Sequence, residues 1–389
     1  MVKTADAVVI GGGIMGASAA HFLAKKGIGT VILLEKRALA AVSTGHSAAN
    51  IRCSYSNPVT IQLALRALEM FENDREELGG PTGFRRTGQI ILLEEEHVDM
   101  GRRVLQAEAQ QDTQTKKIGP DEIKELAPQL KLGKVVWATY QPRAGYVDPV
   151  QTTQTLAQQG KEWGLTVYEG AGARSIQVDG DHVKGVEFDD GFIQTPIVVN
   201  AAGPWGSDMG ASAGRDYSIR WSRECDLILK LPPDFGDFPI VADPGCNIYF
   251  RPQGNDRFLV GLDYPKEIEP LDINHYDPDL DTGTRKRIEK GLFKRIPELR
   301  DAPFDRGWAS VYTITDDWHP LAGPEPGIEG YFACFGGSGH GFKLGPPIGE
   351  ALADVITGEK PRIDIHPLRP SRLKEGEPFT SAWGQGNRA

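Results

Sequence analysis

Short apolar runs and a glycine-rich break alternate at the start of the chain. Residues 6–10 (DAVVI) are apolar and β-branched, residues 14–27 (IMGASAAHFLAKKG) begin with small residues, and residues 30–36 (TVILLEK) form a second apolar run. Gly27 is placed to end the intervening helix. A strand, a glycine turn, a helix and a strand in this order predict a βαβ unit and therefore a parallel sheet.

Further along, apolar and polar positions alternate. Residues 165–203 turn at Asp179-Gly180 and Asp190-Gly191, which predicts an antiparallel meander ending in the apolar strand IVVNAAG. Residues 225–263 form a second β-rich block. Other predicted elements are an amphipathic helical region over 61–78, a strand over 85–96, a charged helix over 283–296 and a loop-to-helix change over 336–356. We therefore predict an α/β fold (α+β overall), with a Rossmann-like domain carrying the meander and a second domain with a mainly antiparallel sheet.

Composition limits the class of protein. At 389 residues the chain exceeds a single comfortable core, so two domains, or one with a large insertion, are expected. A balance of 43 Lys and Arg against 53 Asp and Glu argues against nucleic acid or an anionic membrane as the main partner. The four cysteines show no metal-ligand spacing, which predicts no metal site and a reducing compartment. With no signal peptide and no run of about 18 apolar residues, we predict a cytoplasmic protein without a membrane span.

A nucleotide-binding pattern joins the first strand to the first helix. Gly11-x-Gly13-x-x-Gly16 lies directly between them, and Glu35 ends the second strand. Gly11 permits the tight turn, Gly13 lets the backbone approach a pyrophosphate, and Gly16 lets helix and strand pack closely. The helix N-terminus faces the phosphates, and Glu35 accepts from a ribose hydroxyl. The alternative is a glycine-rich turn without a ligand, and the motif alone does not separate NAD from FAD.

Five motifs occur in an order that resembles a known family. They are GxGxxG with Glu35, STGHSAANIR (43–52), GYVDP (145–149), VVNAAGPW (198–205) and GSGHGFKLGP (337–346). The chain, up to about residue 365, is similar to the FAD-containing amine oxidoreductases of the D-amino acid oxidase superfamily, in particular the sarcosine oxidase and dimethylglycine dehydrogenase group. The resemblance implies a discontinuous FAD-binding domain (1–80, 145–215 and 325–366), a substrate-binding domain (81–144 and 216–324) and a C-terminal tail (367–389). The tail is polar and rich in Gly and Pro, and we expect it to be loop wrapped on the surface or partly disordered.

The resemblance also implies a set of site residues. Arg52 and Lys343 would bind the substrate carboxylate as a two-cation clamp, and Tyr249 and Tyr312 would line the substrate cavity. The alternatives are a surface arginine paired with an acid, a solvated lysine, and two core tyrosines. The implied FAD contacts are Gly11, Gly13, Ile14, Met15, Gly16, Glu35, Lys36, Ser43, Thr44, His46, Ser47, Ala48, Ala173, Ala202, Gly203, Trp205, Gly337, Gly339, His340, Gly341, Phe342 and Lys343.

Three positions depart from parts of that group. Ser310 stands where monomeric sarcosine oxidase has the cysteine that links its flavin, and Leu259 stands where that enzyme has a lysine that helps oxygen react. The resemblance therefore leaves oxidase and dehydrogenase activity open. His46 matches the histidine joined covalently to FAD in dimethylglycine dehydrogenase, so noncovalent packing near the flavin and a covalent link both stay open. Were residues 43–52 helical, His46 and Arg52 would lie on different faces.

The activity implied is flavin-dependent oxidation of the C–N bond of an amino acid. A secondary or tertiary amine such as sarcosine, dimethylglycine or an iminodiacetate-like N-substituted glycine would pass hydride to FAD N5, and the imine would then hydrolyse. His46 is counted with Arg52, Lys343 and the two tyrosines in the catalytic set. The implied partners are the amino acid substrate and oxygen or another electron acceptor, while oligomers and partner subunits stay open. Alternatives are oxidation of a D-amino acid or a 2-hydroxy acid, and a non-catalytic flavin-binding assembly subunit.

Overall fold

A six-stranded sheet forms one half of the molecule. The computed structural model describes residues 2–263 and 267–381. The strand order is β10 (Leu165–Glu169), β3 (Val31–Glu35), β2 (Ala7–Ile10), β14 (Val198–Asn200), β21 (Tyr331–Phe335) and β20 (Leu321–Pro324). All neighbours run parallel except the pair β20 and β21. The βαβ unit predicted from residues 6–36 is confirmed, with α1 (Ile14–Lys25) between β2 and β3.

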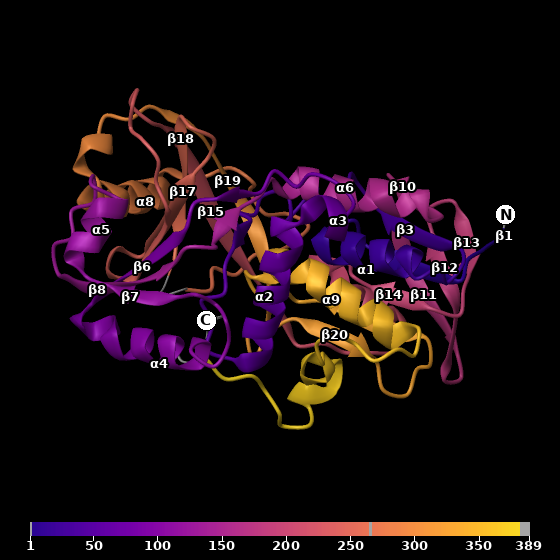
Figure 1. Ribbon diagram of the computed structural model, residues 1–389. Coiled ribbons are helices and arrows are strands. Elements are labelled where there is room, and N and C mark those ends of the chain that lie inside the picture. The colour runs from indigo at the N-terminus through magenta and orange to yellow at the C-terminus, as the bar shows by residue number, and fades with distance from the viewer. Residues whose placement is uncertain (1, 264–266, 382–389) are drawn as a thin grey trace.

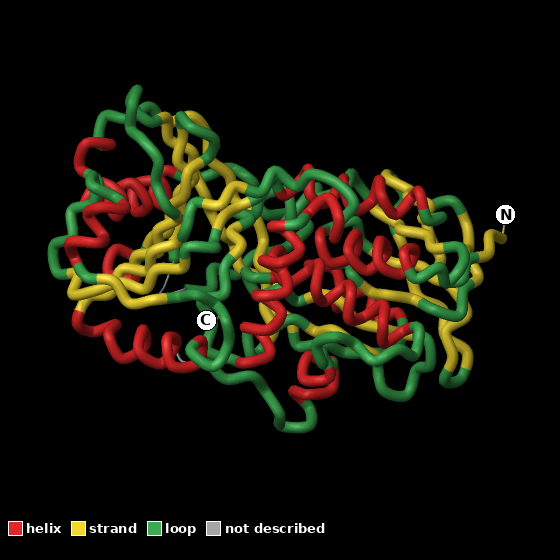
Figure 2. Tube along the Cα trace, viewed as in Figure 1, coloured by secondary structure: helices red, strands yellow, loops and turns green. Residues whose placement is uncertain are grey.

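The two faces of this sheet are covered by different elements because strand side chains alternate. Ala7 and Val9 belong to a core shared with α1 and α9 (Gly341–Ile356), whereas Val8 and Ile10 belong to a core shared with the meander. Helices α1 and α9 lie together in front of the strands in Figure 2, and α6 (Pro149–Glu162) also packs on α1. The sheet is therefore buried on both faces, as expected of a parallel sheet.

The meander has the predicted antiparallel topology. Strands β11 (Ala173–Asp179), β12 (His182–Phe188) and β13 (Gly191–Gln194) pair in sequence, and β1 (Val2–Thr4) adds to β13 in parallel. Gly180 has φ +62°, a left-handed conformation that a tight Asp-Gly turn requires.

An eight-stranded sheet forms the other half of the molecule (Figure 1). The strand order is β19 (Phe304–Thr315), β15 (Ile219–Lys230), β18 (Arg257–Leu262), β17 (Ile248–Pro252), β16 (Ile240–Asp243), β6 (Gln89–Glu94), β8 (Val135–Gln141) and β7 (Lys116–Ile118). Only β16 and β6 run parallel. Residues of α8 (Thr282–Arg295) and α5 (Pro120–Leu126) share a core with these strands. The predicted mainly antiparallel second sheet is thus present.

Shorter elements connect the two sheets. A small sheet has the order β4 (Asn50–Ile51), β9 (Gly145–Tyr146) and β5 (Arg85–Arg86). In Figure 1, α2 (Pro58–Glu72) lies between the two halves. The remaining helices are α3 (Asp74–Glu77), α4 (Val98–Glu108) and α7 (Gly206–Ser212), with single 3-10 turns at Glu95–His97, Gly203–Trp205, Pro244–Cys246, Pro297–Leu299, His366–Leu368 and Pro370–Leu373.

Two local predictions are corrected. The single strand predicted over residues 85–96 is two strands in different sheets followed by a 3-10 turn, because Gly88 (φ +72°) redirects the chain and donates to Ala144 O. The described part of the tail, residues 367–381, is not wholly surface loop, since it contains the 3-10 turn Pro370–Leu373, in which Arg372 is fully buried and pairs with Asp317. In the described part of the chain, no helix combines the length and apolar character needed to cross a membrane. The domain division and the cytoplasmic location stay predictions.

Candidate active site

A cavity of about 360 Å³ lies where the two large sheets meet. Its walls are the glycine turn, the segment 40–54, the loop after β14, strands β15 and β19, and the start of α9. The predicted site residues are all described by the structure, and every one except Gly16 and His340 lines this cavity. Segments from four of the five motifs therefore surround one space, of a size usual for ligand sites, whereas GYVDP (145–149) contributes no residue to the described lining.

The glycine turn brings backbone close to the cavity. Gly11 has φ +107°, and a Cβ built there would lie 2.3 Å from Ala201 O. A Cβ on Gly16 would lie 1.9 Å from Gly11 O, so Gly16 acts in helix packing behind the lining. Gly13 is the N-cap of α1 and offers no side-chain cap, Ile14 N donates to Thr44 Oγ1 at 3.0 Å, and the helix N-terminus faces the cavity. Such an end binds phosphate oxygens.

The acidic residue at the end of β3 is held in the cavity wall. Glu35 Oε2 accepts from Gly12 N at 2.7 Å, and Oε1 accepts from Arg37 N at 2.7 Å. Next to it, the Nζ of Lys36 lies 3.1 Å from the ring centroid of Trp205, and burial lowers the pKa of this lysine. Glu35 retains lone pairs for a further donor, because an ionised carboxylate accepts about four hydrogen bonds.

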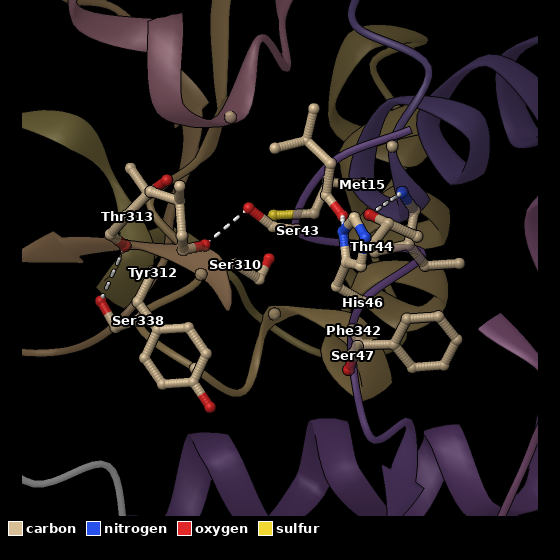
Figure 3. A pocket seen from close by; sticks show the side chains of 18 of the residues that line it. Met15, Ser43, Thr44, His46, Ser47, Ser310, Tyr312, Thr313, Ser338 and Phe342 are labelled. Carbon is tan, nitrogen blue, oxygen red and sulfur yellow. Dashed lines mark hydrogen bonds between the residues drawn. The ribbon is translucent and has the colours of Figure 1, made fainter. Parts of the chain in front are cut away.

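Residues 43–52 form turns followed by strand β4, so the helical hypothesis for this stretch is wrong. Hydrogen bonds to the eight-stranded sheet hold it: Ser43 Oγ donates to Val311 O at 2.6 Å, and Trp308 Nε1 donates to His46 O at 3.2 Å. His46 Nδ1 donates to Val42 O at 2.8 Å, which assigns Nε2 as the unprotonated nitrogen of the neutral ring. Figure 3 shows His46, Thr44 and Met15 facing β19 across the cavity.

Two cations of the cavity lie beside one aromatic ring. The guanidinium carbon of Arg52 is 4.8 Å from the Tyr55 ring centroid, and Lys343 Nζ is 5.8 Å from the same centroid. Arg52 Nη1 donates to Ser54 O at 2.7 Å, and no carboxylate pairs with Arg52 among residues 2–263 and 267–381. Lys343 is only 6% exposed. Arg52 is therefore in no surface ion pair with a described residue, and Lys343 is not a solvated lysine, which were the alternatives for these two residues.

His340 lies behind the lining. Its ring centroid is 5.7 Å from that of Tyr55 and 5.3 Å from that of His319. It therefore packs against the ring that the two cations share. Leu259, at the position compared with an oxygen-activating lysine, is buried in β18 and is absent from the described lining.

Several lining residues were missed by the sequence analysis. The polar ones are Asn50, Ser54, Gln89, Asp208, Glu224, Asp226, Asp263, Thr313 and Ser338, and Ser310 had been named only as the position of a flavin-linking cysteine. A usable signal existed for part of this set, because side chains of a strand alternate and Tyr312 was already assigned to the cavity. Ser310 is two residues before it, and Glu224 is the ladder partner of Ser310.

Comparison with known proteins identifies the family. The family model described as FAD dependent oxidoreductase matches residues 6–355. The chain belongs to this family. It is 28% identical to mitochondrial sarcosine dehydrogenase of Mus musculus, over 94% of this chain and 41% of that protein, and 28% identical to mitochondrial dimethylglycine dehydrogenase of Rattus norvegicus, over 95% and 45%. The chain thus spans less than half the length of these curated relatives.

The structure is similar to that of L-proline dehydrogenase from P. horikoshii, with a TM-score of 0.91 and 29% identity, covering 97% of this chain and 100% of that one. The chain is an FAD-dependent oxidoreductase with the fold of the D-amino acid oxidase superfamily, as the resemblance in sequence implied.

The cavity fits FAD on its own features. The Cβ-free approach at Gly11 and Gly13, the N-terminus of α1 and the carboxylate of Glu35 provide the three contacts that a dinucleotide requires. We infer that Gly11, Gly13 and the first turn of α1 hold the pyrophosphate and that Glu35 holds a ribose. The start of α9 and residues 43–48 line the same cavity, where they can contact the flavin ring.

A buried carboxyl lies behind the Arg52 segment. Glu108 is 1% exposed and accepts from Tyr55 N at 3.2 Å and Thr113 Oγ1 at 3.3 Å. Burial raises the pKa of Glu108 to about 7, although hydrogen bonds from Thr115, Tyr55 N and Thr113 act in the opposite direction. The folded protein therefore binds this proton more tightly than the unfolded chain.

Glu108→Gln is expected to flatten the pH dependence of stability. The contribution of the Glu108 proton is complete below 4.5, the ordinary pKa of a glutamate in the unfolded chain, and is lost as pH rises through about 7. The native protein should lose several degrees of Tm between pH 5 and 8, and Glu108→Gln should lose less. Thermal unfolding at both pH values measures this, with the exposed Glu125→Gln as control. Equal pH slopes for the native protein and Glu108→Gln would contradict the assignment.

Proposed function

We propose that the protein oxidises the C–N bond of an amino acid that carries a secondary or tertiary amine, an N-substituted glycine such as sarcosine or dimethylglycine. The observation that carries the proposal is the pair Arg52 and Lys343, two cations beside Tyr55 in the cavity that fits FAD. Two cations suit a carboxylate, and the planar fork of arginine binds it bidentately without losing charge. The names of the two mitochondrial relatives support the same class of substrate.

The residues of the cavity supply binding and orientation. Arg52 and Lys343 bind the carboxylate and fix the α-carbon, which removes rotational freedom before reaction. Their positive charge also favours the neutral form of the nearby amine, the form that can be oxidised. Tyr249 and Tyr312 close the wall opposite, and Tyr249 is oriented by its hydrogen bond to Asp226 Oδ1 at 2.6 Å. When bound, FAD supplies the two-electron acceptor.

Arg52→Ala is expected to lower kcat/KM for sarcosine by about 100-fold or more, because a charge-assisted bidentate contact to a desolvated carboxylate is lost. The kcat/KM of Arg52→Lys should lie between those of the native enzyme and Arg52→Ala, since lysine keeps the positive charge and loses the planar fork of arginine. Turnover with an artificial electron acceptor measures the effect, and the exposed Arg102→Ala serves as control. An Arg52→Ala variant with wild-type affinity for carboxylate substrates would remove the clamp from the proposal.

Anaerobic reduction of the bound flavin separates the proposal from its rivals. Sarcosine and dimethylglycine are expected to reduce it, whereas preference for D-amino acids or 2-hydroxy acids would assign the alternative reactions. A flavin that no amine reduces would favour a non-catalytic subunit. Reoxidation under oxygen, compared with the artificial acceptor, distinguishes an oxidase from a dehydrogenase. Acid precipitation addresses His46: we expect flavin in the supernatant, and flavin in the pellet would show a covalent link.

A further inference from the structure

The cavity also has an acidic wall, formed by carboxylates at and beside strand β15. Glu224 and Asp226 lie two residues apart on β15, so both side chains lie on the same face of the strand. Asp263 lies just after β18, which pairs with β15. All three line the cavity. On the other face of β15, Arg223 pairs with Glu269 and Asp281, so the charges of the two faces are organised separately.

An independent feature of the same wall points to a ligand. Ser310 is the ladder partner of Glu224, is only 6% exposed and lines the cavity. Its Oγ has no hydrogen-bond partner within residues 2–263 and 267–381. Figure 3 shows this hydroxyl on β19 directed into the space that separates the strand from His46. A buried hydroxyl without a partner is costly, and a bound polar group would satisfy it.

The cavity is therefore polarised. Arg52 and Lys343 provide positive charge at the end beside Tyr55, whereas Glu224, Asp226 and Asp263 provide carboxylates on the strand wall. Asp226 accepts from Tyr249 Oη at 2.6 Å, which places this carboxylate next to a tyrosine assigned to the substrate. An N-substituted glycine whose carboxylate is bound at the cationic end would extend its nitrogen substituent away from that end.

We propose that the acidic wall selects substrates by the charge of the nitrogen substituent. A substituent with a protonated amine is favoured, an uncharged one is accepted, and a carboxylate-bearing one is rejected. This rests on the proposed function and deepens it, because among N-substituted glycines it separates aminoalkyl glycines from iminodiacetate. The physical reason is the sign of the interaction: carboxylates accept charge-assisted hydrogen bonds from an ammonium and repel another carboxylate in a partly desolvated cavity.

The test compares three glycines of similar size. They are N-(2-aminoethyl)glycine, N-propylglycine and iminodiacetate, with sarcosine as reference. We expect kcat/KM to fall about tenfold from the first to the second and about tenfold again to the third. Binding is measured separately from turnover, by the change that each compound causes in the absorption spectrum of the oxidised bound flavin. The dissociation constants should follow the same order.

Glu224→Gln is expected to reduce both ratios severalfold while Asp190→Asn, which changes an exposed carboxylate in the turn before β13, leaves them unchanged. If Glu224→Gln fails to fold, the order in which the native enzyme binds and oxidises the three compounds decides whether the acidic wall selects by charge. Sarcosine oxidation with equal binding of the three compounds, or with iminodiacetate bound best, would overturn the charge selection and leave the proposed function standing. Absence of flavin reduction by every amine would refute the proposed function, and the binding order would still test the acidic wall.

Discussion

Gly16→Ala is expected to yield a protein that retains little FAD, with affinity reduced by about 100-fold or more. A Cβ at this position would lie 1.9 Å from Gly11 O and 3.2 Å from Ala201 Cβ. Both neighbours are parts of the fold that cannot give way separately, because Gly11 already occupies a left-handed turn against the Ala201 carbonyl. The methyl group therefore moves the first turn of α1 away from the glycine turn, and the pyrophosphate loses its backbone contacts.

The ratio of flavin to protein absorbance after gel filtration measures this loss, and titration of the apoprotein with FAD gives the affinity. Gly119→Ala is the matched control, because a Cβ there meets no atom within 4 Å and Gly119, the N-cap of α5, also lies at the start of a helix. That variant should keep its flavin. Full flavin retention by Gly16→Ala would show that α1 and the turn can separate without harm to the site.

The parts of the fold that were predicted correctly depend on local patterns. The apolar run of β2, the glycine turn and the small residues of α1 are adjacent in sequence, so their periodicity and turn chemistry determine one βαβ unit. The Asp179-Gly180 turn does the same for the meander. The site residues were predicted through family motifs, and the fold brings segments more than 300 residues apart in sequence to one cavity.

The remaining features depend on contacts distant in sequence. Residues 43–52 are small and polar with no apolar period, and the bonds to Val311 O and Trp308 that set their conformation come from β19. The acidic wall was missed because Glu224 and Asp226 resemble ordinary exposed carboxylates until the ladder places Glu224 beside Ser310. Docking of the tail depends on Asp317, 55 residues before Arg372, and a polar, Gly/Pro-rich sequence does not indicate such a partner.

Arg372→Met is expected to lower the free energy of unfolding by about 3 to 5 kcal/mol, because it leaves the Asp317 carboxylate buried without its countercharge. The pair is bidentate, with Nε to Oδ2 and Nη2 to Oδ1 both at 2.8 Å, and the side chains are 0% and 1% exposed. Burial raises the pKa of Asp317, but the hydrogen bonds and charge of Arg372 more than offset this, and the net pKa lies below its ordinary value. The contribution is therefore present at neutral pH and is lost only as pH falls through that lowered pKa.

Denaturant unfolding measures the change. The control is Arg362→Ala, which removes an exposed ion pair with Glu69 and should lower the free energy of unfolding by about 1 kcal/mol or less. Arg372→Met combined with Asp317→Asn should recover part of the loss, since the buried charge is removed and the oxygen that accepts from Phe379 N is kept. If the double variant were no more stable than Arg372→Met, lost packing rather than an unpaired charge would be the cause.

The same variant connects the tail to the substrate end. Phe379 stacks on His319 with ring centroids 4.4 Å apart, His319 contacts His340, and His340 contacts the Tyr55 ring beside Arg52 and Lys343. Release of the tail would remove one side of this stack directly behind the loop that starts α9. Arg372→Met should therefore weaken carboxylate binding at temperatures well below its own Tm, measurable as a rise in KM for sarcosine, while Arg362→Ala should show no such rise. An unchanged KM would confine the tail to a structural role.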